Sequence, residues 1–173
     1  MRKRFRILSL AIIMVFINCK QKAEEEFQMT YPEEELGVIK ARYSDGSLAI
    51  GGFNRGYKGY TDKSKYPWSL TVIISLNPED CKSSGLPNEE ETKLVNQIED
   101  ELVEEILKVS PTHNVGHIFN DHELSIYLYT RDKSKVEKLL NTEARKENSL
   151  RPFRHELLKD PNWNAVEQFM GNK

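Results

Sequence analysis

The histidines come closest to a chemical site in this sequence. His113 and His117 fall in a segment that has the composition of a β-strand. On a strand they share one face but lie roughly 13 Å apart, at about 3.3 Å per residue, which is too far to share a metal ion. His122 could approach His117 across a hairpin, but neither a cysteine nor a suitably placed carboxylate completes a ligand set. We therefore predict no metal and no cofactor, and a partly buried, hydrogen-bonded His117 on an apolar side with Val115 and Phe119.

Carboxylates are plentiful, but those between Glu89 and Glu105 recur at a helical spacing that places most of them on one solvated face. A general acid and base pair needs a cleft and two carboxyl groups with different pKa values, and the spacing indicates neither. Nucleophile-elbow, phosphate-loop and zinc-protease motifs are absent from the sequence. We predict no catalytic residue; the alternative is a small hydrolase or transferase that uses carboxylates with His117 or His155.

The stretch from Phe53 to Tyr66 interleaves aromatic and basic residues with glycine. Aromatic faces and cations on a flexible loop can bind an anionic glycan, a peptide or a partner protein. We interpret four residues of this stretch as a binding patch: Arg55, Tyr57, Lys58 and Tyr60. The alternative is a mobile polar loop whose tyrosines pack over the edge of a sheet.

The amino terminus has the pattern of an export signal. Four basic residues precede an apolar run of about eleven residues, too short to cross a bilayer core of roughly 30 Å as a helix. The run ends at Phe16-Ile17-Asn18-Cys19, which resembles a loose bacterial lipobox. We predict a lipoprotein signal peptide over 1–18, a palmitate-bearing diacylglycerol on Cys19, and attachment to a membrane of the bacterial cell envelope, facing the periplasm or the cell surface. The alternative is a secretory signal cleaved nearby, with Cys19 left as an ordinary thiol.

The second cysteine, Cys81, would be the only thiol left once Cys19 is lipidated, so no internal disulfide is expected. It lies in the polar stretch 77–85, which predicts a loop. A reactive thiol or an intermolecular bridge is one interpretation. We favour a tolerated loop cysteine, because no adjoining histidine or arginine would lower its pKa.

The charge balance argues against a nucleic-acid partner. The chain of 173 residues has 27 acidic and 25 basic residues, and without segment 1–18 the count is 27 against 21, a formal charge of −6. An acidic domain without a basic stripe is a poor candidate for binding nucleic acid through the release of counterions. Segment 19–36 is rich in glutamate and predicts a solvated tether. Its early acidic cluster also resembles signals for surface display; a plain charged linker is the alternative.

Strand and helix periods alternate over 37–173, which predicts a single α+β domain. The strongest strand begins at Trp68, and a helix capped by Asn88 and Glu91 follows it. Ser134 and Glu137 predict a second capping box, at the start of a later helix. The expected order from Trp68 is strand, helix, strand, strand, helix, strand, the ferredoxin-like βαββαβ arrangement. We also expect one extra N-terminal strand at 47–54, at an edge or bulged, and a short C-terminal helix after Asp160. The expected strands of this arrangement are 68–76, 113–119, 124–130 and 152–158, and its expected helices are 88–109 and 134–146.

Several short motifs occur in a specific order and spacing. They are Gly85-Leu86-Pro87-Asn88-Glu89-Glu90-Glu91, Ile98-Glu99-Asp100-Glu101-Leu102, Val115-Gly116-His117-Ile118, Tyr127-Leu128-Tyr129-Thr130-Arg131-Asp132 and Asp160-Pro161-Asn162-Trp163. Together they resemble a bacterial family catalogued as domain of unknown function 695, over roughly 47–170. The family carries no established activity, so the resemblance implies a domain type and no catalytic residue.

These patterns predict a lipid-anchored envelope protein that acts as a non-catalytic binding module. Its expected partners are the membrane, through the N-terminal lipid, and an envelope protein or glycan.

Overall fold

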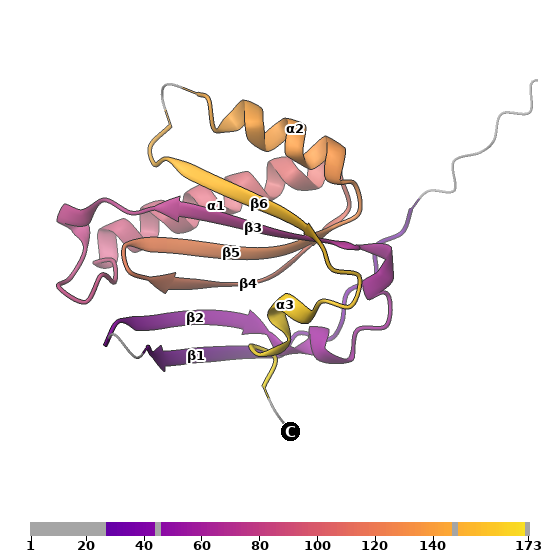
Figure 1. The fold of residues 1–173 in the computed structure, drawn as a ribbon, viewed down its shortest axis with the longest axis horizontal. Coiled ribbons are helices and arrows are strands. Elements are labelled where there is room, and N and C mark those ends of the chain that lie inside the picture. Colours follow the sequence, from indigo (N-terminus) through magenta and orange to yellow (C-terminus); the bar gives the residue numbers. More distant parts are fainter. Residues whose placement is uncertain (1–26, 44–45, 147–148, 172–173) are drawn as a thin grey trace, which may run out of the picture.

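The computed structural model of the protein describes residues 27–43, 46–146 and 149–171. Within them, six strands form one antiparallel sheet in the order β1-β2-β4-β5-β3-β6, accompanied by three α-helices (Figure 1). The predicted mixture of helices and strands is confirmed. In chain order the elements are β1 (Leu36–Arg42), β2 (Leu48–Asn54), the 3₁₀ turns η1 (Arg55–Gly59) and η2 (Lys63–Lys65), β3 (Trp68–Ser75), the 3₁₀ turn η3 (Pro78–Asp80), α1 (Glu89–Val109), β4 (Thr112–Asn120), β5 (Glu123–Thr130), α2 (Lys133–Glu143), β6 (Phe153–Lys159) and α3 (Asn164–Glu167).

The predicted signal peptide 1–18, the lipid site at Cys19 and the first part of the tether lie outside the described residues. The helices that the structure does describe all lack the length and hydropathy of a membrane-crossing segment. The last part of the tether, from residue 27, runs along the domain. Phe27 and Met29 pack against buried residues, and the Glu35 amide donates to Asn54 Oδ1 over 3.0 Å.

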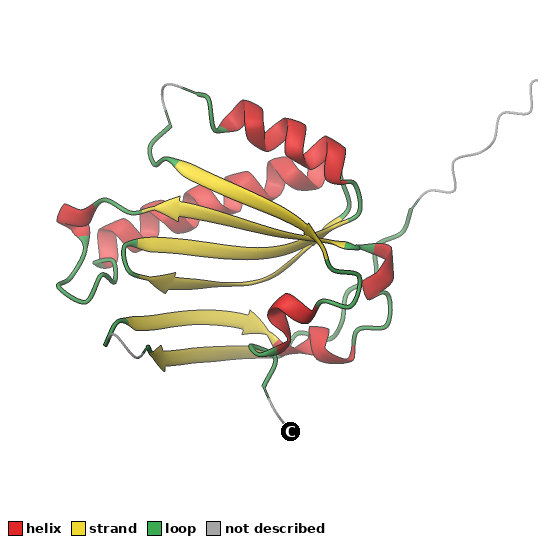
Figure 2. Cartoon of the chain, viewed as in Figure 1, coloured by secondary structure: helices red, strands yellow, loops and turns green. Residues whose placement is uncertain are grey.

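The two faces of the sheet bury two separate clusters. Alternating residues of β3 and β5 pack against α1 and α2 and form a helix-side core: Leu70, Val72, Ile74, Leu124, Ile126, Leu128, Ile106 and Leu140. Residues of β2, β4 and the turns after β2 pack against the C-terminal segment and form an α3-side core: Ala49, Phe53, Tyr57, Tyr66, Val115, Ile118, Tyr129, Trp163, Val166 and Met170. Figure 2 shows the unequal cover, since no long helix crosses the β1–β2 hairpin.

The helix starts follow local signals. Asn88 caps α1 as predicted, because its side chain accepts a hydrogen bond of 2.8 Å from the Glu91 amide. The cap of α2 is Asp132, which accepts from the Lys135 amide over 3.2 Å, and not the predicted Ser134. An aspartate side chain two residues earlier competes successfully for the same free amides.

The prediction of one extra N-terminal strand is wrong, because the sheet has two. β2 matches the predicted strand 47–54, but it lies inside the sheet, between β1 and β4. The edge belongs to β1, whose Val38 pairs with Gly52 of β2. β1 escaped prediction because apolar residues stand on both of its faces: Leu36 and Val38 are exposed, whereas Ile39 packs against the α3-side core. Its sequence therefore lacks the alternation that marks a half-buried strand.

A β-bulge in β4 overturns the prediction that His113 and His117 share a face. The register with β5 shifts between Asn114 and Gly116, so one extra residue reverses the alternation. Gly116 has a φ of 155°, and a Cβ there would lie 2.3 Å from the Gly52 carbonyl oxygen, so only glycine fits. His113 consequently faces the α3-side core with Val115, whereas His117 lies on the helix side.

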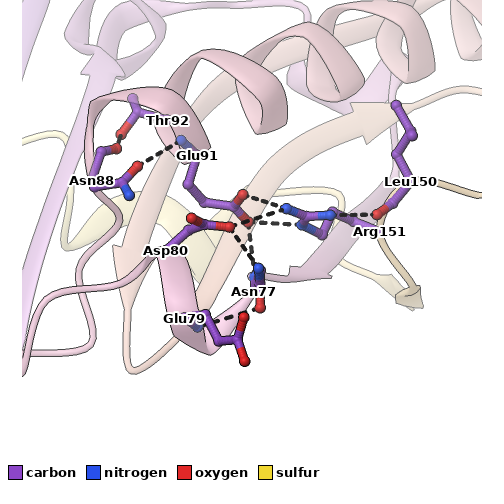
Figure 3. A network of polar contacts seen from close by, with 8 residues as sticks. All are labelled: Asn77, Glu79, Asp80, Asn88, Glu91, Thr92, Leu150 and Arg151. Carbon is purple, nitrogen blue, oxygen red and sulfur yellow. Dashed lines mark hydrogen bonds and ion pairs between the residues drawn. The ribbon is translucent and has the colours of Figure 1, made fainter.

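A buried ion pair ties the start of α1 to the segment before β6 (Figure 3). The Glu91 carboxylate, 2% exposed as a residue, accepts from Arg151 Nε at 2.8 Å and Nη2 at 2.5 Å. It also accepts from the Asn77 amide at 2.8 Å, just after β3. The hydrogen bonds from Arg151 lower the pKa of Glu91, despite its burial. Three segments far apart in the chain therefore meet at one carboxylate.

We expect Arg151→Ala to lower the free energy of unfolding by about 3 kcal/mol, because it leaves the Glu91 carboxylate buried without a charged partner. The matched control is Arg154→Ala, which removes an exposed ion pair with Glu123 and should cost at most about 1 kcal/mol. Urea denaturation at pH 7, followed by circular dichroism, measures both. Equal losses for the two variants would contradict the special role of the Glu91 pair.

Candidate functional site

The predicted binding patch is folded onto the domain. Residues 55–59 and 63–65 form the turns η1 and η2, and Tyr57 is buried in the α3-side core. Tyr60 is half-buried, whereas Lys58 is exposed. The tyrosines therefore pack over the sheet, as in the alternative interpretation of this stretch.

His113 holds these tyrosines in place. It is fully buried, with Nδ1 3.1 Å from the Tyr57 hydroxyl and Nε2 3.0 Å from the Tyr60 hydroxyl. Because the Tyr60 hydroxyl donates its proton to the Thr30 carbonyl, Nε2–H must donate to Tyr60, and Nδ1 accepts from Tyr57. Burial lowers the pKa of His113 to about 4, so the ring is neutral at pH 7. His113 is thus a structural hub of the α3-side core.

The basic members of the patch lie away from His113. The Lys58 ammonium donates to the Gly171 carbonyl, and Lys58 lines a cavity of about 140 Å³ together with Tyr57 and Trp163. The Arg55 side chain covers Gly37 of β1, and its buried Nε has no hydrogen-bond partner among the described residues. The structure therefore brings Tyr57 and Tyr60 together at His113, and Tyr57 and Lys58 together at this cavity, but not all four predicted residues at one place.

His117 makes a histidine–carboxylate pair on the helix side. Its Nδ1 lies 2.7 Å from Oε2 of the buried Glu99, and Asn114 Nδ2 donates to the other Glu99 oxygen over 3.3 Å. The predicted partly buried, hydrogen-bonded histidine is confirmed, and Phe119 shares its side, but Val115 lies on the other face because of the bulge. A carboxylate that orients an imidazole can support general-base chemistry, which is the arrangement that the hydrolase or transferase alternative needs. Burial lowers the pKa of His155, which lies on β6, apart from this pair.

Neither a metal site nor a reactive thiol emerges from the side chains that the structure describes. No group of three or more histidine, cysteine or acidic residues among them is placed to hold a metal ion. Cys81 forms an isolated β-bridge with Pro87, and burial together with the Glu91 carboxylate raises the pKa of its thiol. A raised pKa favours the unreactive thiol, consistent with a tolerated loop cysteine.

A second group of cations and aromatic rings was missed by the sequence analysis. An open groove of about 1600 Å³ lies beside the start of α2. Two cation–π pairs stand in it: the Arg131 guanidinium lies 4.1 Å from the centroid of the Phe27 ring, and Lys133 Nζ lies 5.2 Å from that of Trp68. The groove is lined by Phe27, Gln28, Lys65, Trp68, Val109, Pro111, Arg131, Asp132, Lys133, Ser134 and Lys135. We call it the α2 groove.

The charge of the α2 groove is only partly neutralised. Lys65 Nζ lies 2.8 Å from Asp62, and Lys135 Nζ lies 3.5 Å from Asp132. Arg131 and Lys133 have no carboxylate within ion-pair distance among the residues described. Two cations held against aromatic faces therefore remain available to an anionic ligand.

Sequence reasoning missed the α2 groove because its parts come from four distant segments. The run Arg131-Asp132-Lys133-Ser134-Lys135 was the one available signal, since it places three cations within five residues. The aromatic partners, Phe27 and Trp68, reach the groove only through the fold.

We expect His113→Gln to flatten the pH dependence of stability between pH 6.5 and 4. The folded-state pKa of His113, about 4, lies below the usual 6.5, so the unfolded chain takes up a proton first as the pH falls. Between pH 6.5 and 4 the free energy of unfolding of the wild type should therefore fall by about 3 kcal/mol because of His113. Losses from other groups should be the same in the wild type and in His113→Gln. His122→Gln, an exposed control, should keep the wild-type slope in urea denaturation at each pH; identical slopes for all three proteins would contradict the assignment.

Comparison with known proteins agrees with the motif analysis. The model described as "Family of unknown function (DUF695)" matches residues 43–170, close to the range that the motifs span. No curated protein and no solved structure matches the chain. Because the match covers well over half of the sequence, the chain belongs to the DUF695 family, whose function is unknown.

Proposed function

We propose that the protein is a lipid-anchored binding module of the bacterial cell envelope, which holds an anionic glycan in the α2 groove. The observation that carries this proposal is the pair of cation–π contacts, Arg131 on Phe27 and Lys133 on Trp68. An aromatic face fixes the position of each cation without neutralising it. Sulfate, phosphate or carboxylate groups spaced along a sugar chain would meet preformed charges on a largely acidic domain.

The predicted anchor supports this location. Cys19 precedes Phe27, which lines the α2 groove, by eight residues. A chain of that length spans about 28 Å when fully extended. Lipidation of Cys19 would thus keep the groove close to the membrane surface, where envelope glycans are concentrated.

We further infer that β3, β4, β5 and β6 with α1 and α2 form a ferredoxin-like unit. The order β4-β5-β3-β6 and the positions of the two helices in the chain support this assignment. In that arrangement the β1–β2 hairpin extends the sheet on the β4 side, and the α2 groove lies where β5 passes into α2.

We expect Arg131→Gln combined with Lys133→Gln to weaken binding to dextran sulfate by about ten-fold, because two unneutralised charges are lost. The control variant, Lys93→Gln with Arg154→Gln, removes the same charge from exposed ion pairs on other surfaces and should bind as the wild type. Isothermal titration with dextran sulfate, and with neutral dextran as the unbound reference, measures the affinity. Equal affinity of the two double variants would reject the α2 groove as the binding site.

We expect cells fed radiolabelled palmitate to label the protein through Cys19. Cys19→Ser should abolish the label, because it removes the acceptor thiol, whereas Cys81→Ser should keep it. Gel autoradiography of the immunoprecipitated protein reports both. Label that survives Cys19→Ser would reject the lipoprotein assignment and favour a cleaved secretory signal.

A further inference from the structure

The outer strand β1 presents apolar side chains that nothing in the described structure covers. Leu36 is 76% exposed and Val38 68% exposed, and Ile50 on the neighbouring β2 is 37% exposed. These three share the face on which α1 and α2 lie, since Val38 and Lys40 pair with Gly52 and Ile50, while Ala49 and Phe53 of β2 face the α3-side core. The long helices stop short of this part of the sheet (Figure 2).

The backbone of β1 also has outward-pointing amides and carbonyls, and they belong to every second residue of the strand. The Glu35 carbonyl accepts from the Arg55 amide at 2.7 Å, and the Tyr43 amide donates to the Ser47 carbonyl at 2.9 Å. Odd-numbered residues of β1 therefore bond to β2, and an antiparallel ladder alternates strictly. The amides and carbonyls of the even-numbered residues, from Leu36 to Arg42, point away from the sheet.

We propose that β1 pairs with β1 of a second copy of this chain, antiparallel and about a two-fold axis at Gly37. The two sheets then join into one continuous sheet. In this register Leu36 lies opposite the partner's Val38, and Glu34 lies opposite the partner's Lys40. Leu36, Val38 and Lys40 lie on the helix-side face, and Glu34 follows them if the alternation of β1 continues two residues before the strand. Leu36 then contacts Val38, and Glu34 contacts Lys40, twice each by symmetry.

Hydrogen bonding limits the register to those that pair even-numbered residues, and the apolar contact selects among them. Leu36 and Val38 each turn their amide and carbonyl outward, so they can form a hydrogen-bonded pair across the axis. Gly37 then occupies a non-hydrogen-bonded pair, where two Cα atoms approach to about 4.5 Å. Shifting the axis to Val38 would place Leu36 opposite the partner's Lys40 and lose the apolar contact.

The acidic and basic ends of the strand make the pairing self-complementary. Residues 33–35 are three glutamates, whereas Lys40 and Arg42 stand at the other end of β1. Antiparallel pairing brings each acidic end beside the basic end of the other copy. A parallel pairing would bring like charges together.

The opposite edge of the sheet, β6, lacks these features. Leu157 is already buried in the helix-side core, and Phe153 packs against it. Arg154 is engaged by both carboxylate oxygens of Glu123, at 2.7 and 2.9 Å. Among the described residues of β6, Leu158 is the one large apolar side chain that is exposed, at 57%, whereas β1 exposes two, Leu36 and Val38, on one face. β1 is therefore the edge that we assign to the second copy.

Charge reversal tests the register directly. In the mature chain carrying Cys19→Ser, sedimentation equilibrium should show a monomer–dimer equilibrium, and Glu34→Lys or Lys40→Glu alone should weaken it by at least about ten-fold. An equimolar mixture of the two single variants should dimerise as the wild type, because every cross-strand pair is again of opposite charge. The double variant Glu34→Lys with Lys40→Glu should also recover.

A second variant guards against misfolding. Val38→Pro removes an amide that points outward, so β1 keeps its ladder with β2 while the dimer is lost; circular dichroism should match the wild type. A wild type that stays monomeric at all concentrations overturns the proposal. Glu34 and Lys40 would then be charges that protect an unpaired edge strand from aggregation. A dimer that survives both single charge reversals, or a mixture no more dimeric than its components, overturns it as well.

Discussion

Strand β4 carries one residue more than β5 between Asn114 and Gly116, and Gly116 passes too close to Gly52 for any side chain. This bulge decides what each face of the sheet contains. Upstream of it, His113 enters the α3-side core and satisfies two tyrosine hydroxyls; downstream, His117 meets Glu99 under α1. Without the extra residue, one of the two histidines would be driven into a core that offers it no partner, at the cost of an unsatisfied buried polar group.

The two clusters stabilise different parts of the domain. The helix-side core is aliphatic except for Phe119, and it packs the long helices against the sheet. The α3-side core is rich in aromatic rings joined by hydrogen bonds, and it fastens the chain ends: Phe27 enters from the N-terminal side and Trp163 from the C-terminal side. The candidate ligand groove lies at the junction of the two, where Phe27 meets Arg131 and Trp68 meets Lys133.

Apart from the cap of α2, sequence reasoning succeeded where one residue and its near neighbours decide the outcome. The alternation of β3, the Asn88 cap of α1 and the mixed α and β class all rest on local signals. It failed where the local structure depends on backbone that is distant in the sequence. The bulge at Gly116 depends on the approach of Gly52, which lies more than sixty residues away, and so the parity of the histidines could not be inferred. β1 contributes only Ile39 to a core and is otherwise held by pairing with β2, and the α2 groove needs the fold to bring Phe27 and Trp68 to its cations.

The two tryptophans of the chain lie in contrasting surroundings. Trp163 is buried, stacks on Tyr129 with ring centroids 4.1 Å apart, and donates its indole N–H to the Lys63 and Tyr66 carbonyls. Trp68 is partly exposed beneath Lys133 in the α2 groove. Their emission should therefore separate by wavelength, with Trp163 blue-shifted and Trp68 red-shifted. Intrinsic fluorescence can thus follow the aromatic core and the groove at the same time, without an added label.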